Sequence, residues 1–336
     1  MCGLPSWSSV AVRRFLATLL LFVVGTLNFG CGPERQIVSA SLDHEKWQPW
    51  QIIETKTGKV LSFPEWIKNL ERYEIVYVGE EHYNSHHIDA AISIMSGFIT
   101  DGIRPVLGME MFSWDGQAAL NDYLFNQALD RTAFLEQVQW KTNWGGAFEN
   151  YEPLVSFTKD RRVPIQAMNP PKSLIRRVVK LGLAQARKEE EWKQWGLSEE
   201  DIVDDPAYRA RILDQLQRCH GGGAEEDYRT MYEASMVRDE GMAKTLVSTV
   251  EKVRREKAVS RAIIVSYTGG GHIQYNLPVP NRVARRLAGG IRQTTVYLTS
   301  FDRARAEDIQ DLIREPIADY IWLTPVSGQG PVQRCR

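Results

Sequence analysis

A short polar stretch combines two carboxylates and an imidazole directly after an apolar run. The stretch reads GEEH at 79–82 and follows EIVYV. A carboxylate beside a histidine can act as a base with its orienting partner. The structural alternative is that Glu80 and Glu81 cap the following helix while His82 satisfies a buried backbone group. The residue types alone do not separate these interpretations.

Short apolar runs alternate with longer amphipathic segments along most of the chain. Strands are predicted at residues 74–78, 105–109, 163–168, 262–267, 295–299 and 320–323. Helices are predicted at residues 85–100, 116–126, 152–159, 172–181 and 224–255. This alternation predicts one α/β domain at about 46–330, with a mostly parallel central sheet flanked by helices. The densely charged segment at about 183–225 is predicted to be a helical insertion.

Candidate functional residues follow several of these predicted strands. The first strand ends at Glu80, Glu81 and His82, the second at Glu110, and the fourth at a glycine run that leads to His272. In an open α/β sheet, ligands bind beyond the carboxyl ends of the strands. We therefore expect these five residues to share one cleft, as catalytic groups if the protein is a hydrolase. Within this set, His82, Glu110 and His272 are the predicted ligands of a divalent transition metal.

Several short segments, in this order, resemble the ChaN-like family. They are GEEH with the following pair of histidines, GMEMF at 108–112, NW at 143–144, YEPL at 151–154, AMN at 167–169, RD at 238–239 and GGGH at 269–272. That family is similar to the wider Tiki and erythromycin-esterase group. The resemblance implies a bacterial, often lipid-anchored protein associated with haem binding and iron uptake. It also implies a metal or hydrolytic centre at Glu80, His82, Glu110 and His272.

Haem is the ligand that the resemblance implies. Haem requires an axial ligand such as Tyr or His and an apolar, aromatic-walled slot. The candidate haem-binding residues near the matched segments are Tyr83, His86, His87, Trp144, Tyr228, Tyr232, Arg238, Asp239 and Tyr275. Their spacing singles out no axial ligand. For the tyrosines at 228 and 232 a stripe of core residues is the structural alternative, and for residues 238 and 239 it is a helix salt bridge.

The N-terminal segment is typical of an export signal. Two arginines precede an uncharged apolar run at 15–30, and Cys31 follows directly. This order predicts a lipoprotein-type signal peptide at 1–30, lipidation of Cys31 and a tether at 31–45. An ordinary cleaved signal or a retained anchor is the alternative. We expect an exported protein, lipid-anchored at the cell membrane or the outer membrane.

Composition limits the partners of this chain. The formal net charge of −1 and the absence of a long basic block give no reason to expect nucleic acid. Cys219 and Cys335 are candidates for one disulfide in an exported protein. The sequence thus predicts a membrane-tethered protein that binds haem or a related iron ligand and acts in its uptake. A metal-dependent hydrolase and an interaction module with a degenerate site are the alternatives, and a homodimer is left open.

Overall fold

The computed structural model describes residues 47–126, 128–221, 223–256 and 261–327. The predicted signal peptide, the tether, Cys31 and Cys335 lie outside these residues. Cys219 is disulfide-bonded, and its pairing with Cys335 stays a prediction. Within the described part of the chain, no helix is both long and apolar enough to cross a membrane.

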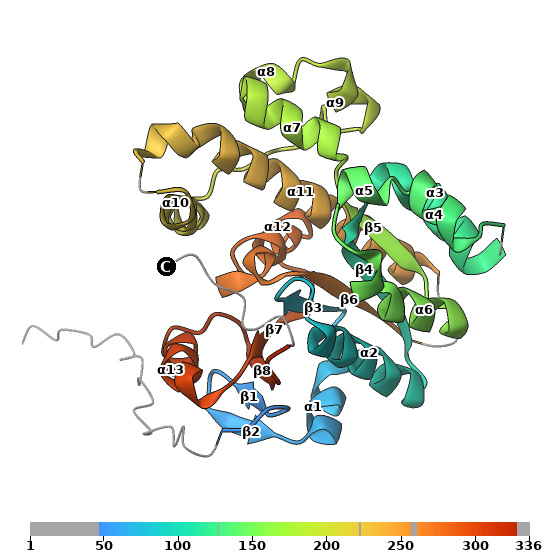
Figure 1. Ribbon diagram of the computed structural model, residues 1–336, viewed down its shortest axis with the longest axis vertical. Helices are drawn as coiled ribbons and strands as arrows, with labels where there is room; N and C mark the ends of the chain where they lie inside the picture. Colours follow the sequence, from blue (N-terminus) through green and yellow to red (C-terminus); the bar gives the residue numbers. More distant parts are fainter. Residues whose placement is uncertain (1–46, 127, 222, 257–260, 328–336) are drawn as a thin grey trace, which may run out of the picture. The chain divides into compact units, whose positions relative to one another are not determined.

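An eight-stranded sheet forms the centre of the fold (Figure 1). Its strands are β1 (Ile52–Glu54), β2 (Lys59–Leu61), β3 (Ile75–Glu80), β4 (Arg104–Ser113), β5 (Ile165–Asn169), β6 (Ala262–Gly269), β7 (Gln293–Ser300) and β8 (Tyr320–Thr324). They lie in the order β2-β1-β8-β7-β3-β6-β4-β5. The strands from β8 to β5 pair in parallel, whereas β1 pairs antiparallel with β2 and with β8. The predicted mostly parallel sheet is confirmed.

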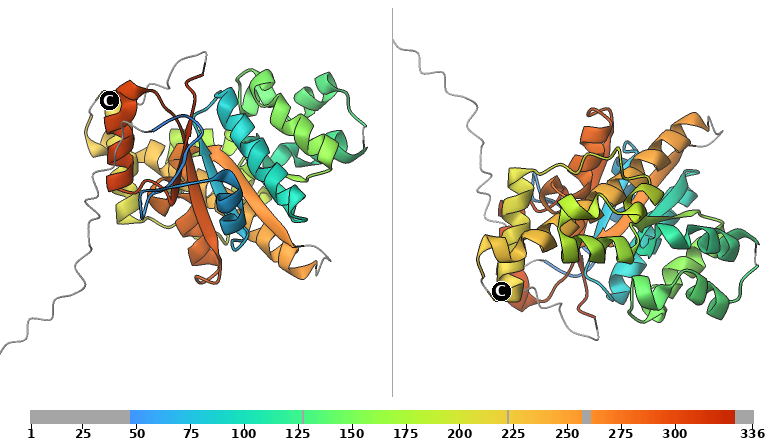
Figure 2. Two further views of the ribbon diagram at one scale, coloured as in Figure 1. Left: turned by 90° about the horizontal axis from the view of Figure 1, so that it is seen from below. Right: turned by 90° about the horizontal axis from the view of Figure 1, so that it is seen from above.

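Helices cover both faces of this sheet (Figure 2). They are α1 (Phe63–Leu70), α2 (Ser85–Thr100), α3 (Gln117–Asn121), α4 (Arg131–Gln137), α5 (Trp140–Asn143), α6 (Glu152–Arg161), α7 (Lys172–Leu181), α8 (Leu183–Ala186), α9 (Glu190–Gln194), α10 (Pro206–His220), α11 (Glu225–Arg255), α12 (Val279–Arg286) and α13 (Ala306–Arg314). Helices α1, α2 and α6 pack on one face, and α11, α12 and α13 pack on the other.

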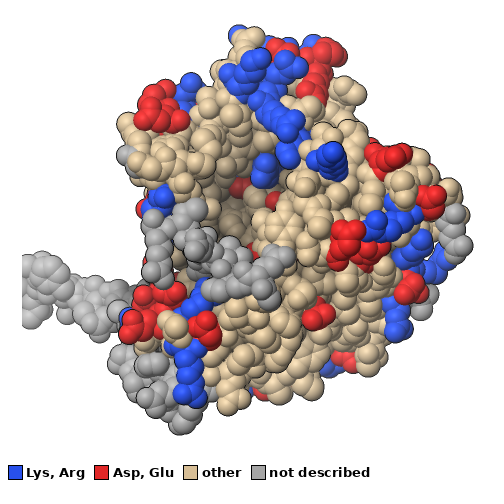
Figure 3. Space-filling view, viewed as in Figure 1, with Lys and Arg blue, Asp and Glu red and all other residues tan. Residues whose placement is uncertain are grey.

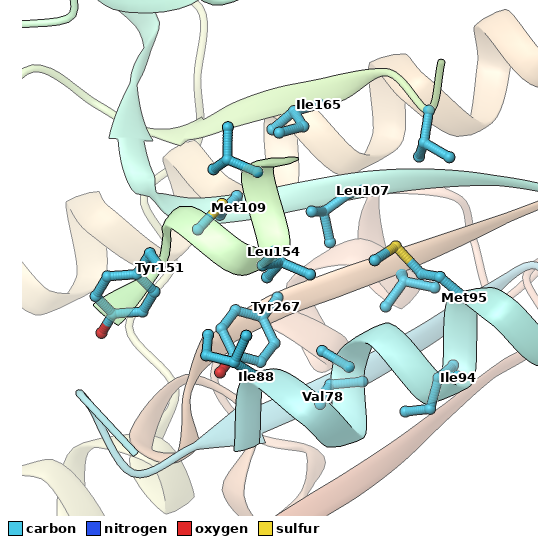
Figure 4. Packing of buried hydrophobic residues seen from close by; sticks show 14 of the residues in the cluster. Val78, Ile88, Ile94, Met95, Leu107, Met109, Tyr151, Leu154, Ile165 and Tyr267 are labelled. Atoms are coloured by element: carbon cyan, nitrogen blue, oxygen red, sulfur yellow. The ribbon is translucent and has the colours of Figure 1, made fainter. Parts of the chain in front are cut away.

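Side chains of the central strands alternate between the two cores. In β3, Val76 and Val78 join the core beneath α1 and α2, whereas Ile75 and Tyr77 join the core beneath α11 and α12. Successive strand residues point to opposite faces, so a strand buried on both sides is apolar throughout. Figure 4 shows the first core, where Val78 lies beside Ile88 of α2.

The structure differs from the prediction mainly at the edges. All six predicted strands are present with small boundary shifts, but β1 and β2 were missed because each has only three residues. The helix predicted at 116–126 is divided into α3 and a π-helical turn, Asp122–Asn126. The predicted insertion forms α8, α9 and α10, which pack with α7 and α11 around two small apolar clusters.

Gly79, near the carboxyl end of β3, allows a close approach of the chain that follows β6. A methyl group here would lie 2.9 Å from the Gly270 Cα and 2.6 Å from the Ile273 Cδ1. We expect Gly79→Ala to lower the free energy of unfolding by about 1–3 kcal/mol, because the contact must be relieved by moving packed atoms. Denaturant unfolding measures this.

Gly271 provides the matched control, because a methyl group there meets nothing within 4 Å. Gly271→Ala should therefore unfold close to wild type. Equal stability of the two variants would show that β3 and the segment after β6 are not packed as described.

Candidate functional site

Three neighbouring strands bring the candidate residues to one edge of the sheet. Strand β6 lies between β3 and β4. Glu80 ends β3 and lies opposite Gly269, which ends β6, while His272 follows in a 3-10 turn. Glu110 lies inside β4, where the pairing with β5 becomes irregular after Met109. Such an irregularity re-aims side chains, and it explains why Glu110 reaches the site before its strand ends.

Glu80 and His82 form a hydrogen-bonded pair at this edge. The buried Glu80 carboxylate accepts hydrogen bonds from the hydroxyls of Tyr267 (2.6 Å) and Tyr151 (2.9 Å). Its other contact is the Nδ1 of His82, at 2.7 Å. The carboxylate therefore fixes the orientation of the ring, and 40% of the His82 side chain stays exposed.

Burial and hydrogen bonding act in opposite directions on this pair. Burial raises the pKa of Glu80, and the hydrogen bonds from His82, Tyr267 and Tyr151 only partly offset it. Burial alone would lower the pKa of His82, but the hydrogen bond to Glu80 and the nearby Glu110 charge raise it above its ordinary value. The two groups thus hold a proton between them more firmly than either would in water.

His272 lies between two buried carboxylates. Its Nδ1 is 2.6 Å from an oxygen of Asp239, and its Nε2 is 3.2 Å from an oxygen of Glu110. The Asp239 carboxylate also accepts a hydrogen bond from the Tyr208 hydroxyl (2.6 Å), and Glu110 accepts one from the Gly269 amide (2.7 Å). Every carboxylate of this cluster therefore accepts hydrogen bonds from neighbouring groups.

The cluster stabilises an imidazolium. Burial alone would lower the pKa of His272, but the charges of Glu110 and Asp239 raise it to about 10. Burial would likewise raise the pKa of Glu110, yet the charges of His272, His82 and Arg238 hold it well below its ordinary value. With both ring nitrogens facing carboxylates, His272 must release a proton before it can bind a metal ion.

The predicted metal site is not supported by this arrangement. Among the described residues, no group of three or more His, Cys, Asp or Glu side chains is placed to hold a metal ion. The structure does bring His82, Glu110 and His272 together, as the sequence predicted. Hydrogen bonds and electrostatic attraction hold these three residues together.

Glu81 and His87 bond mainly to the strands beside the GEEH loop. The Glu81 carboxylate bonds to the hydroxyls of Thr299 and Ser300. The fully buried His87 accepts from the Glu81 amide at Nδ1 (2.9 Å) and lies 3.0 Å from the Thr324 hydroxyl at Nε2. These two residues connect the GEEH loop to β7 and β8 through hydrogen bonds. Because His87 is fully buried, a ligand cannot contact it.

The alternative in which Glu80 and Glu81 cap α2 does not hold. The side chain that caps α2 is Asn84, which accepts a hydrogen bond from the His86 amide. The carboxylates of Glu80 and Glu81 bond to the hydroxyls described above instead of to amides of that first turn.

A cleft of about 440 Å³ opens above the cluster. Glu80, Glu81, His82 and His272 line it together with Tyr275. Other parts of its wall come from α10 and from residues near β7, and they are Arg211, Asp214, Gln215, Arg218, Cys219, Gln274, Tyr297 and Ile317. Figure 3 looks into a hollow with acidic atoms at its floor.

Tyr275 is the candidate haem ligand that this cleft contains. Its ring lies 4.0 Å from the Arg211 guanidinium, and its backbone has a φ of 56°. A left-handed conformation is uncommon for a tyrosine and marks positions that the surrounding structure enforces. The Tyr275 hydroxyl makes no hydrogen bond to a described residue and is available to a ligand.

The remaining haem candidates lie elsewhere. Tyr228 accepts a hydrogen bond from the Gly223 amide and Tyr232 donates one to Asp204, so both serve the packing of α10 against α11. His86 contacts Trp50 edge to face. Outside the cleft wall, the Tyr83 ring packs closely against Gly146. The structural alternative holds for the pair at 228 and 232.

Trp144 and Arg238 lie near the acid–imidazole cluster but do not line the cleft described above. The Trp144 ring lies edge-on to His82, with centroids 5.0 Å apart. Arg238 makes no salt bridge with Asp239; its charge acts on Glu110 instead. Both residues line a second, smaller pocket.

Sequence reasoning missed the tyrosines that hold the carboxylates. Tyr151 and Tyr267 donate to Glu80, and Tyr208 donates to Asp239. The first two lie within segments that were singled out, YEPL and the fourth strand. A tyrosine within a buried strand must find a partner for its hydroxyl, and this signal could have assigned Tyr267.

The fold and this cluster define an α/β protein with a buried acid–imidazole centre at the carboxyl edge of its sheet. The chain belongs to the haem-binding uptake family ChaN of the Tiki superfamily, whose family model matches residues 66–283. The resemblance inferred from the sequence is confirmed.

Solved structures share the fold at low sequence identity. The structure described as cofacial heme binding to ChaN of Campylobacter jejuni is 17% identical, covers 81% of this chain and 95% of its own, and has a TM-score of 0.59. A mutant erythromycin esterase in its open conformation is 11% identical, with 84% and 98% covered and a TM-score of 0.45. No curated protein matches the sequence.

The buried His87 makes stability depend on pH. Burial lowers its pKa to about 4, whereas an unfolded chain takes up this proton near pH 6.5. Between these values only the unfolded state is protonated. The free energy of unfolding should therefore fall by up to about 3 kcal/mol from this group as the pH is lowered from about 6.5 to about 4.

Chemical denaturation at a series of pH values measures this effect. His87→Gln cannot titrate, so its unfolding free energy should change less over the same range, even if it is lower at pH 7. Parallel curves for the variant and the wild type would contradict the assignment of a neutral buried imidazole.

Proposed function

We propose that this protein binds haem as cargo in the cleft above the acid–imidazole cluster and acts in haem or iron uptake. The observation that carries the proposal is membership of the haem-binding ChaN family over residues 66–283. The cleft volume of about 440 Å³ lies within the range of about 300–1,000 Å³ that ligand pockets occupy.

The residues of the cleft fit a haem. Tyr275 offers a phenol oxygen as axial ligand, which is one of the groups that hold haem iron in proteins. The guanidinium of Arg211 lies over the Tyr275 ring as a cation–π contact and holds this ring at the cleft wall. Tyr297 and Ile317 give apolar surface for the porphyrin plane. His82 faces the same cleft with its exposed side.

The location that we propose is the outer face of a bacterial membrane, through a lipid on Cys31. A basic pair, an apolar run and a cysteine occur in the order of a lipoprotein signal. We expect wild-type protein to be acylated and to fractionate with membranes, and Cys31→Ala to be unlipidated and to fractionate differently. Mass spectrometry of the N-terminal peptide and membrane fractionation measure this. An unlipidated wild type that fractionates like the variant would contradict the anchor.

A metal-free hydrolase is the second candidate, and the Glu80–His82 pair favours it. Because Glu80 holds Nδ1, the other ring nitrogen of His82 is free to take a proton from water.

Haem titration of the mature protein tests the first candidate. Wild type should give a saturable Soret shift, and Tyr275→Phe should weaken binding by about tenfold or more, because the axial bond is lost while the ring remains. Absorption spectroscopy measures both the affinity and the change of ligation.

Tyr83→Phe is the matched control, because it removes the same hydroxyl from a neighbouring tyrosine outside the cleft wall, and it should bind like wild type. Unchanged haem affinity in Tyr275→Phe would remove the ligand assignment. A featureless titration of the wild type, together with ester hydrolysis that His82→Gln abolishes, would favour the hydrolase.

A further inference from the structure

A second pocket, of about 180 Å³, lies on the other side of the acid–imidazole cluster. It is formed where the start of α7 faces α11, and Trp144, Asn169, Lys172 and Arg238 line it. This volume is less than half that of the larger cleft, which is about 440 Å³. The smaller pocket therefore suits a smaller ligand than the larger cleft does.

The two cations of this pocket lack close partners in the protein. Lys172 and Arg238 form no ion pair within 4 Å and no hydrogen bond with any described residue, and the same is true of Arg176, one turn along α7. The charge of Arg238 acts on Glu110 only at longer range. Burial and the charges of Arg176 and Arg238 together lower the pKa of Lys172. Three cations that repel one another at a partly buried site are stabilised by an anion.

The three arginines of α12 contrast with these cations, because they surround the buried carboxylate of Glu240, with nitrogen–oxygen distances of 2.6–3.3 Å. Figure 3 shows basic side chains running over the region of α7 toward the hollow.

Neutral hydrogen-bonding groups also point to an anion. The indole N–H of Trp144 is buried and has no partner among the described residues. The first turn of α7 has no acidic residue and no side-chain cap, so its free amides add positive potential at the same place. The residues that carry these donors and cations line one small pocket.

An unpaired acceptor, the side-chain oxygen of Asn169, indicates which class of anion the pocket binds. The buried Oδ1 of Asn169 has no partner, while the Nδ2 of this residue donates to the Glu110 carbonyl (2.7 Å). A carboxylate has no hydrogen to give to this oxygen, whereas a phosphate group carrying one proton offers both anionic oxygens and a hydroxyl. We propose that this pocket binds a phosphate group, either free phosphate or a small phosphomonoester.

Binding of inorganic phosphate to the full chain tests the proposal. Calorimetry should give a saturable isotherm, and the Trp144 indole resonance in a ¹⁵N spectrum, assigned with Trp144→Phe, should shift with the same affinity. Lys172→Gln and Arg238→Gln should each weaken phosphate binding by about tenfold or more. Arg238→Lys keeps the charge and should bind more tightly than Arg238→Gln, which separates loss of charge from loss of fold.

Lys180→Gln is the matched control. It removes the same charge from the exposed last turn of the same helix and should bind phosphate within about twofold of wild type. Absence of saturable binding at millimolar phosphate would overturn the proposal, as would equal weakening by Lys180→Gln.

Two further titrations identify which class of anion the pocket binds. Acetate at the same ionic strength should shift the Trp144 resonance far less than phosphate. Equal effects would overturn the phosphate assignment and identify a carboxylate site, such as one for haem propionates. A small phosphomonoester, glycerol phosphate, should compete with free phosphate, and failure to compete would restrict the site to the free ion.

Discussion

The structure depends on the burial of three carboxylates at one edge of a parallel sheet. Glu80, Glu110 and Asp239 are each almost inaccessible to solvent. A charge taken out of water is costly unless it is paired and hydrogen-bonded. Three tyrosine hydroxyls, two imidazoles and a backbone amide meet this requirement. The positions of these donors then determine where strands, loops and the long helix α11 can lie.

This constraint also gives the two histidines different chemistry. His272 faces a carboxylate at each ring nitrogen and is held as an imidazolium, so it contributes a fixed positive charge. His82 bonds to one carboxylate only and presents the rest of its ring to the cleft. The first histidine is thus an electrostatic element of the site, and the second is a group that can meet a ligand.

The sequence predicted the framework of the site because it is encoded locally. Short apolar runs identified the strands, and the rule that their carboxyl ends converge brought together Glu80, His82, Glu110 and His272. The partners of these residues could not be predicted in the same way. Tyr151 directly precedes α6 and Asp239 lies on α11, and the orientation of each helix depends on tertiary packing. Glu81 and His87 carry the chemistry of a site but face β7 and β8, which a sequence pattern does not reveal.

Two pockets adjoin the cluster of buried carboxylates, and their side chains suit different ligands. The larger cleft has an aromatic wall and an unbonded phenol at Tyr275, which suits a large planar ligand. The smaller pocket has unpaired cations and buried polar groups, which suit a small anion. Trp144 contributes to both environments, because its ring lies edge-on to His82 and the residue also lines the smaller pocket. Because the two pockets share none of their lining residues, a substitution can alter one pocket without removing a side chain from the other.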